Sequence, residues 1–218
     1  GKIVFGINIA RDIPPGTPNK KDIVISGIAK IDSPDIPTPV ESNKIIASNT
    51  VNIGIKTKIG LTVGGFYNDS MIKNSGPVPP IVGQETSYTI HWKVFNMYND
   101  LKDARVEAVI PTGAIMTGSK IPIDANLIYN ERNNNLVWNI GNVPAGTGFT
   151  SPPKEFIFQV KIRPGTDQIG KSAGLVGLVT FSGKDAFTNI NLSVNSPAKT
   201  TELKEDASLS PSAGWVVP

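Results

Sequence analysis

Apolar and polar residues alternate along several short segments of this chain, most clearly along residues 85–100. Tyr88, Ile90, Trp92 and Val94 share one face of an extended strand, because successive side chains of a strand point to opposite sides. The residues between them are polar or charged and would face water. The pattern therefore predicts a strand with one buried face, and such a strand needs a second sheet to cover it.

The rest of the chain supplies further segments of this kind and no helical period of useful length. Glycine (21) and proline (18) are frequent and interrupt the apolar runs, which is typical of short strands joined by turns. Gly64-Gly65 predicts a bulge or a switch between sheets, and the run Asn133–Asn135 predicts a hairpin loop. About eight strands are expected after residue 57, over residues 59–67, 87–95, 104–110, 125–130, 136–140, 155–162, 175–181 and 189–194.

Segments near the N-terminus resemble segments near the C-terminus, and they follow in the same order. Their spacing falls only from 153 to 145 residues, which indicates an internal repeat of about 150 residues. The alternative is a single closed domain in which residues 1–57 and 157–205 are homologous halves. The matched pairs are 4–9 with 157–162, 25–29 with 175–179, 35–38 with 185–188, and 45–48 with 190–193.

The repeat gives a prediction of domain organisation. Residues 1–57 are interpreted as the C-terminal strands of an upstream repeat, residues 58–205 as a complete repeat, and residues 206–218 as a linker or tail. The open edge of an incomplete sheet needs cover, either from the complete repeat or from a missing half. The tail is expected to be poorly packed; the alternative is that residues 215–217 pack back onto the module.

Composition and charge argue against several classes of protein and leave the predicted fold unchanged. The net charge is +3, and the longest basic run is Lys20-Lys21, so a nucleic-acid partner is not expected. The chain has no cysteine and no stretch of about 18 apolar residues, so a thiolate metal site and a membrane span are not expected. No leader sequence is recognisable at Gly1, and we expect the chain to be a piece of a longer protein.

Side chains that could carry catalysis or bind a metal are few and dispersed. His91 is the only histidine and is interpreted as a surface residue of its strand rather than as a base or ligand. Asp100 with Asp103, or residues 99–100 with residues 133–135, could offer oxygen ligands to calcium, but turn and capping roles are more common. There is no G-x-S-x-G motif. We therefore assign no catalytic residue, no metal ligand and no cofactor.

Aromatic residues pose a choice between a core and a platform for sugar rings. Trp92, Trp138, Tyr88 and Phe158 lie in phase with aliphatic residues, which favours burial between two sheets. Four other aromatic residues are expected to be more exposed and are too far apart in sequence to predict a platform. They are Tyr67, Tyr98, Tyr129 and Trp215.

A covalent cross-link between strands is a further hypothesis for a sandwich without disulfides. The lysine considered is Lys58, beside the first strand of the complete repeat, with Asn189 or Asn191 near the last strand as its partner. Asparagine and lysine at strand ends are common, so an ordinary surface role is the simpler interpretation.

Three segments resemble a known family. They are residues 82–90 (VGQETSYTI) with Phe95-Asn96, residues 108–113 (AVIPTG), and residues 137–146 (VWNIGNVPAG). Together they are similar to the immunoglobulin-like conserved repeat domains that occur in tandem in bacterial and archaeal surface proteins. The family usually has Asp-x-Leu-Pro where this chain has Ile110-Pro111-Thr112-Gly113, so an acidic residue is missing there. The resemblance implies a β-sandwich that serves as a spacer outside the cell.

The sequence thus predicts an all-β protein, an immunoglobulin-like antiparallel β-sandwich preceded by strands of a neighbouring repeat. The expected function is that of a non-enzymatic structural, stalk or adhesin-type module at the cell surface. Its expected partners are neighbouring repeats of the same chain, with a surface protein or glycan as a further partner. The alternatives are a carbohydrate- or protein-binding module and, third, a hydrolase domain, which would need a pocket with convergent titratable groups. The identity of any ligand and its binding residues stays unknown.

Overall fold

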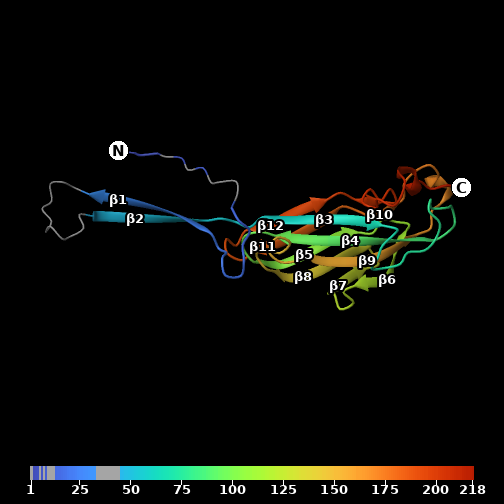
Figure 1. Cartoon of the computed structure of the whole chain (residues 1–218), viewed down its shortest axis with the longest axis horizontal. Helices are drawn as coiled ribbons and strands as arrows, with labels where there is room; N and C mark the ends of the chain where they lie inside the picture. Colours follow the sequence, from blue (N-terminus) through green and yellow to red (C-terminus); the bar gives the residue numbers. More distant parts are fainter. Residues whose placement is uncertain (1, 5, 7, 9–12, 33–44) are drawn as a thin grey trace.

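The computed structural model describes residues 2–4, 6, 8, 13–32 and 45–218. A β-sandwich contains most of the chain after residue 58, and a two-stranded hairpin projects from one end of it (Figure 1). The hairpin consists of β1 (Val24–Asp32) and β2 (Ile45–Gly54). The C-terminus lies at the opposite end of the sandwich (Figure 1).

The sandwich consists of two antiparallel sheets. The order of the first sheet is β3 (Ile59–Phe66), β4 (Thr86–Asn96), β9 (Lys154–Ile162), β6 (Ala114–Ile121). The order of the second is β12 (Asn191–Ser196), β11 (Val179–Asp185), β5 (Leu101–Val109), β8 (Asn135–Val143), β7 (Leu127–Asn130). The remaining elements are β10 (Gly174–Val176), which pairs with β13 (Lys199–Thr200), and two short 3-10 helices, η1 (Thr166–Gln168) and η2 (Pro211–Gly214).

This strand order is that of an immunoglobulin-like domain with one insertion. Taken along the chain, β3, β4, β5, β6, β9, β11 and β12 occupy the positions A to G, with A-B-E-D in one sheet and C-F-G in the other. The hairpin of β7 and β8 is inserted between positions D and E and pairs beside position C. The predicted fold class is therefore confirmed.

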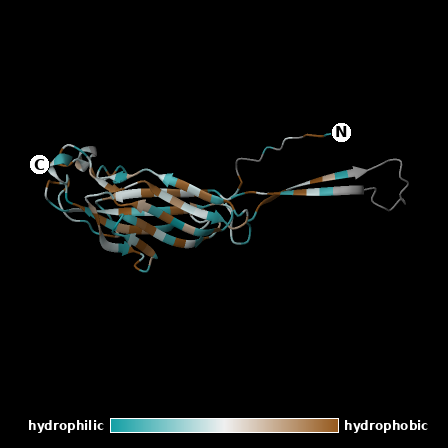
Figure 2. Cartoon of the chain, turned by 180° about the vertical axis from the view of Figure 1, so that it is seen from behind, coloured by the Kyte–Doolittle hydropathy of each residue, from teal (hydrophilic) through white to brown (hydrophobic). Residues whose placement is uncertain are grey.

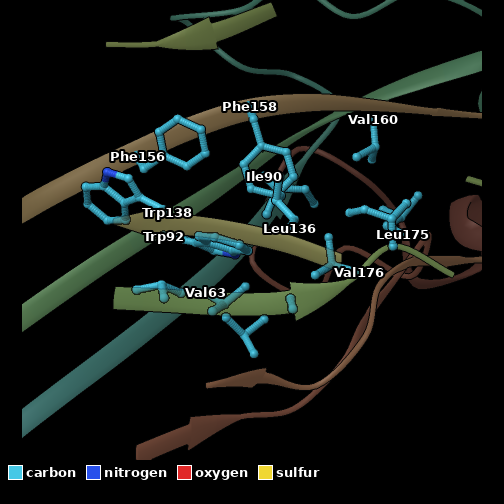
Figure 3. Close-up of a cluster of buried hydrophobic side chains, with 14 of the residues drawn as sticks. Val63, Ile90, Trp92, Leu136, Trp138, Phe156, Phe158, Val160, Leu175 and Val176 are labelled. Carbon is cyan, nitrogen blue, oxygen red and sulfur yellow. The ribbon is translucent and has the colours of Figure 1, made fainter. Parts of the chain in front are cut away.

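The predicted aromatic core is also confirmed. Trp92, Tyr88 and Phe158 are at most 1% exposed and Trp138 is 6% exposed. Trp92 lies edge-on to Phe158, with ring centroids 5.0 Å apart, and Trp138 stacks on Phe156 at 5.4 Å. These rings and their aliphatic neighbours fill the space between the sheets (Figure 3). Apolar and polar positions alternate along the sandwich strands (Figure 2), as the period of two requires.

Three details of the strands differ from the prediction. Gly64 and Gly65 do not form a bulge, because β3 stays in register with β4 through His91 and Ile90. A Cβ on Gly64 would lie 2.7 Å from Phe66 Cε2, so a larger residue there would require the Phe66 ring to turn aside. The predicted strand over residues 175–181 is two strands, β10 and the start of β11. Strand β6 was not predicted, and its pairing with β9 is irregular between Met116 and Lys120.

The polar face of β4 is more covered than its pattern predicted. Thr89 is fully buried, because the loop after β3 folds over it. Its hydroxyl donates to Ile72 O at 3.2 Å and accepts from Asn74 Nδ2 at 2.9 Å. Polar alternation therefore indicated which side of the strand faces away from the core and did not show that a loop covers part of it.

The prediction of a poorly packed C-terminal tail is wrong. Val216 is 1% exposed and belongs to the core, and Val217 forms backbone hydrogen bonds with Val82 (3.0 Å) and Pro80 (2.9 Å). Asp206 is also buried, and its Oδ2 accepts from the backbone of Tyr67 at 2.9 Å. The segment has no period because it packs as irregular chain through isolated apolar residues. The division of the chain into repeats stays a prediction.

Candidate functional site

A set of buried polar contacts joins the hairpin to the sandwich, and we call it the joint. Residues 13–23 before β1 and residues 55–58 after β2 pass the end of the sandwich nearest the hairpin. There they meet the loops that connect β4 to β5, β8 to β9 and β11 to β12. The joint consists of Gly16, Lys21, Asp22 and Thr57 on the hairpin side and Asn96, Asn99, Asp100 and Asp185 on the sandwich side.

Asp185 is the centre of the joint and is fully buried. Its Oδ2 accepts from the backbone N–H of Thr57 at 2.5 Å and from Asn99 Nδ2 at 2.9 Å. Its Oδ1 accepts from the backbone of Phe187 and Thr188 at 2.9 and 3.0 Å, which shapes its own turn. Burial by itself raises the pKa of Asp185, but the donated hydrogen bonds outweigh burial and hold that pKa below its usual value.

Asn96 and Thr57 extend this network across the joint. Thr57 donates its hydroxyl to Asn96 Oδ1 at 2.7 Å, and the same hydroxyl accepts from Tyr98 N at 2.9 Å. Asn96 Nδ2 donates to the carbonyl oxygens of Asn99 and Val143 at 2.7 and 2.8 Å. Because these groups are buried and paired, breaking one contact leaves another polar group unsatisfied.

The segment before β1 is attached at the same place. Gly16 N donates to Met97 O at 2.7 Å, and Asp22 N donates to Asn99 Oδ1 at 3.1 Å. Lys21 forms an ion pair with Asp100. The hydrogen bond that Lys21 donates to Asp100 is the main reason that the pKa of Lys21 is raised. Burial raises the pKa of Asp100, but the same hydrogen bond helps to bring that pKa below its usual value. Both ends of the hairpin are thus held against one end of the sandwich.

The hairpin itself has two unlike faces. The cross-strand pairs Ile25 with Ile53 and Gly27 with Val51 lie on one face, which we call the apolar face. Val51 is 58% exposed and Ile53 is 59% exposed. The other face carries Ser26, whose hydroxyl donates to Asn52 Oδ1. Thr50, Lys30, Val24 and Ile28 lie on the same face. Within the described residues, no element of the sandwich covers the apolar face.

His91 lies on the outer side of the first sheet between two carboxylates. Its Nδ1 is 2.7 Å from Glu155 Oε1 and its Nε2 is 2.7 Å from Asp69 Oδ2. Asp69 also accepts from the backbone of Met71 and Ile72 at 2.8 Å. Burial raises the pKa of Asp69, but these contacts together bring it below its usual value. His91 therefore anchors the loop after β3, and its side chain is more covered than expected for a surface strand residue.

The residues considered for calcium have structural roles. Asp100 pairs with Lys21 and accepts from Ala145 N at 3.0 Å, whereas Asp103 is exposed. Asn133 and Asn134 bond within their hairpin loop, to Asn135 N and to the hydroxyl of Tyr129. The described part of the chain holds no group of three or more histidine, cysteine, aspartate or glutamate side chains that could bind a metal.

The residues considered for a cross-link are not brought together by any hydrogen bond in the described part of the chain. Lys58, Asn189 and Asn191 are all exposed. Asn189 adopts a positive φ of 60° and its N–H donates to Asp185 O at 2.9 Å, which is the turn role that asparagine commonly has.

Sequence reasoning missed the joint. Its centre, Asp185, lies in a segment that was matched to residues 35–38 as part of a repeat, and those residues lie outside the described part of the chain. Of the matched segment 4–9, three positions also lie outside it. A sequence signal was present in the polar corner 96–103 after a strong strand, but an Asn-rich corner predicts only a turn. Which distant backbone group it binds depends on the fold.

The fold and the joint define a β-sandwich module of the immunoglobulin-like class that carries a hairpin at one end. No protein-family model matches this chain, and no curated protein sequence matches it. In the described part of the chain, no helix is both long and apolar enough to cross a bilayer.

Comparison with solved structures finds bacterial proteins of low sequence identity. BcpA, the major pilin subunit of Bacillus cereus, is 10% identical with a TM-score of 0.37, over 71% of this chain and 50% of that one. The full-length major pilin SpaD of Corynebacterium diphtheriae is 10% identical with a TM-score of 0.36, over 83% and 59%. A DUF4466 family protein of Parabacteroides merdae is 14% identical with a TM-score of 0.24, over 64% and 44%. The chain thus spans about half the length of these proteins.

Proposed function

We propose that this chain is a non-enzymatic structural module of a prokaryotic surface protein, in which it acts as a spacer between other parts of the same polypeptide. One observation carries the proposal: the hairpin enters at one end of the sandwich and the C-terminus leaves at the other (Figure 1). A module connected in this way adds its full length to the protein.

The length that one module adds follows from its strands. Strand β4 has 11 residues, which at about 3.3 Å of rise per residue corresponds to about 35 Å. The joint supports the same role, because buried hydrogen bonds at Asp185 and Asn96 fix the direction in which the hairpin leaves. A spacer with a rigid end transmits its length to the next module.

The titratable groups also support a structural role. Four aspartates have lowered pKa values, and each accepts hydrogen bonds from backbone N–H groups or neighbouring side chains. Strongly shifted groups in a cleft would indicate catalysis, but these four fix loops and chain ends. They are Asp69, Asp100, Asp185 and Asp206.

A change in module number tests the proposal in the intact surface protein. Deleting or duplicating residues 58–218 should move a distal epitope tag toward or away from the cell envelope by about the length of one module, roughly 35 Å. Super-resolution imaging of the tag on intact cells measures that distance, and a tag placed on the envelope side of the module is the control. An unchanged distance, or a tag that is never accessible outside the cell, would refute the spacer role.

A ligand-binding role is the second candidate, and Trp215 is the observation that favours it. Its side chain is 51% exposed and it lines a surface pocket with Leu209 and Glu202. Aromatic rings of this kind can stack on sugars. Screening residues 1–218 and the variant Trp215→Ala on a glycan array tests this role. Specific binding that the variant loses would replace the spacer role with carbohydrate binding.

A further inference from the structure

We infer that β1 and β2 are the last two strands of a second sandwich, whose remaining strands are supplied by a preceding repeat of the same polypeptide. This inference names the partner of the hairpin and so deepens the proposed spacer function. Three observations carry it: the bare apolar face, the correspondence with β10 to β12, and the direction in which the joint holds the hairpin.

Among the residues that the structure describes, none covers the exposed apolar side chains of the hairpin or its two outer edges. A two-stranded hairpin is at best marginally stable in water, and unpaired edges invite a further strand. Yet β1 and β2 are paired over nine positions, from Val24 with Gly54 to Asp32 with Ile45. A long ribbon with Val51 and Ile53 exposed on one face is the surface that a facing sheet would bury.

The sequence match relates the apolar face of the hairpin to the core-facing side of the sandwich through Ala29, the counterpart of Val179 at the start of β11. Carried over by the internal match, Ile25, Gly27 and Ala29 correspond to Leu175, Gly177 and Val179. Leu175 and Val179 are fully buried, and of the two only Val179 lies in β11; Leu175 lies in β10, where Val176, the counterpart of Ser26, is fully buried as well. On the other face Ile28 corresponds to Leu178, and these two residues are exposed alike, at 59% and 57%.

The second strand of the hairpin agrees with the first. Val51 corresponds to Ser196, which is buried on the inner side of β12. The register of β1 with β2, carried over, differs from that of β11 with β12 by two residues. An even difference keeps every side chain on its face, whereas a shift of one residue would reverse all of them. From Ala29 and Val179 onward, the two hairpins therefore match face for face.

The covered hairpin shows what the partner must provide. Strand β11 uses one edge for β12 and the other for β5, from Val179 with Ala108 to Asp185 with Leu101. Its inner side packs on the aromatic core through Phe181. The partner of β1 and β2 is accordingly a sandwich that lacks its own last two strands, with a free edge for β1 and an apolar inner face.

A second copy of the described chain does not fit this requirement. Its sandwich already holds β11 and β12 in the last two positions. The joint also directs the hairpin away from the sandwich of its own chain (Figure 1), so that sandwich cannot cover it. A preceding repeat would lie on the far side of the joint, along the same long axis, and would supply the missing strands in cis.

Hydrogen exchange of the intact protein, compared with residues 1–218 alone, tests this inference. In the intact protein the backbone amides of β1 and β2 should exchange at least about 100-fold more slowly than in residues 1–218, because the facing sheet closes over them. Amides of β4, covered in both samples, serve as the internal reference. Equal exchange of the hairpin in both samples would overturn the inference.

Two neighbouring substitutions make the test specific to the apolar face. Val51→Lys in the intact protein should speed exchange of the hairpin by about 10-fold or more, because it places a charge against the facing sheet. Thr50→Lys, on the opposite face of the same strand, should leave exchange unchanged. Equal effects of the two lysines would contradict the face assignment.

Self-association of residues 1–218 would give a result different from those of the two experiments above. Protection of the hairpin in residues 1–218 that rises with protein concentration, together with a dimer in sedimentation, would assign a second copy as the partner and overturn the inference. Hairpin exchange does not report the position of a distal epitope. The partner assignment and the spacer role can therefore fail separately.

Discussion

Two hairpins of this molecule lie in opposite surroundings. β11 and β12 lie in a five-stranded sheet, where Val179 and Phe181 are fully buried, whereas β1 and β2 project from the end of the sandwich with Val51 and Ile53 exposed. Both are antiparallel pairs, and the pairing of β1 with β2 shifts its register between Ile31 and Asp32. The comparison shows that local pairing does not decide where the stability of a hairpin comes from. The cover on its apolar face does.

The joint connects the covered hairpin with the projecting one. Asp185 forms the turn between β11 and β12, and it also binds Thr57 at the root of the projecting hairpin. One carboxylate thus completes the turn of the covered hairpin and anchors the bare one. A substitution of Asp185 therefore perturbs both hairpins, whereas a substitution within one hairpin perturbs that hairpin alone.

The largest effect on the free energy of unfolding is expected from a cavity in the core beneath the covered hairpin, β11 and β12. Phe181→Ala removes a fully buried ring from the inner face of β11 and should lower the free energy of unfolding by about 3–5 kcal/mol. Val51→Ala, on the apolar face of the bare hairpin, should change it by less than about 0.5 kcal/mol in residues 1–218. Urea denaturation followed by tryptophan fluorescence measures both. Similar losses for the two variants would mean that the bare hairpin is already covered.

The joint should show an intermediate effect. Asp185→Asn keeps the size of the side chain but turns an N–H group toward donors such as Thr57 N and removes the charge. We expect a loss of about 2–3 kcal/mol, with faster hydrogen exchange at the amide of Thr57. Asp124→Asn, at an exposed position, is the matched control. A variant as stable as the control would show that the hairpin is not anchored through Asp185.

Acid should weaken the same anchor gradually. The pKa of Asp185 and that of Asp206 lie below the ordinary value of 3.8 in the folded chain. Their contribution to stability is therefore complete above the unfolded pKa and is lost as pH falls below about 4. Thermal unfolding between pH 7 and pH 3 should show a flat region and then a decline. Asp185→Asn should decline less steeply than the parent protein, and parallel curves would contradict this assignment.

The comparison also explains how much the sequence could predict. Alternation along residues 85–100 identified β4 and its aromatic core because burial follows directly from the period of a strand. The same reasoning missed the packed tail, because Val216 and Asp206 are single contacts in irregular chain. It missed the joint for a related reason. Asp185 and Thr57 are 128 residues apart, and no local pattern states which distant N–H a carboxylate will bind.

Matching the chain with itself predicts more about the projecting hairpin than the local pattern of that hairpin does. Its apolar residues alone predict strands but not their cover. The match of Ala29 with Val179 predicts a buried position for the face that Ala29 shares with Val51. The structure adds the register, which keeps the two hairpins in the same phase. Neither source alone would have related the exposed face to a core.

The smallest effect on global stability is expected from Gly16→Ala, which separates attachment of the hairpin from folding of the sandwich. A Cβ on Gly16 would lie 2.4 Å from Tyr98 O, so the segment before β1 must move away and lose its bond to Met97 O. The segment makes no contribution to the aromatic core. The free energy of unfolding should therefore change by less than about 1 kcal/mol.

Hydrogen exchange would reveal the local change that global unfolding does not. Amides of residues 16–22 should exchange about 10-fold faster in Gly16→Ala, because their bonds to the sandwich open without the core unfolding. Gly6→Ala, where a Cβ would meet nothing within 4 Å, should leave these amides unchanged. If Gly16→Ala instead destabilised the core as strongly as Phe181→Ala, the joint would be part of the cooperative folding unit of the sandwich. The bare hairpin would then be an extension of that unit, and its attachment could not be varied independently.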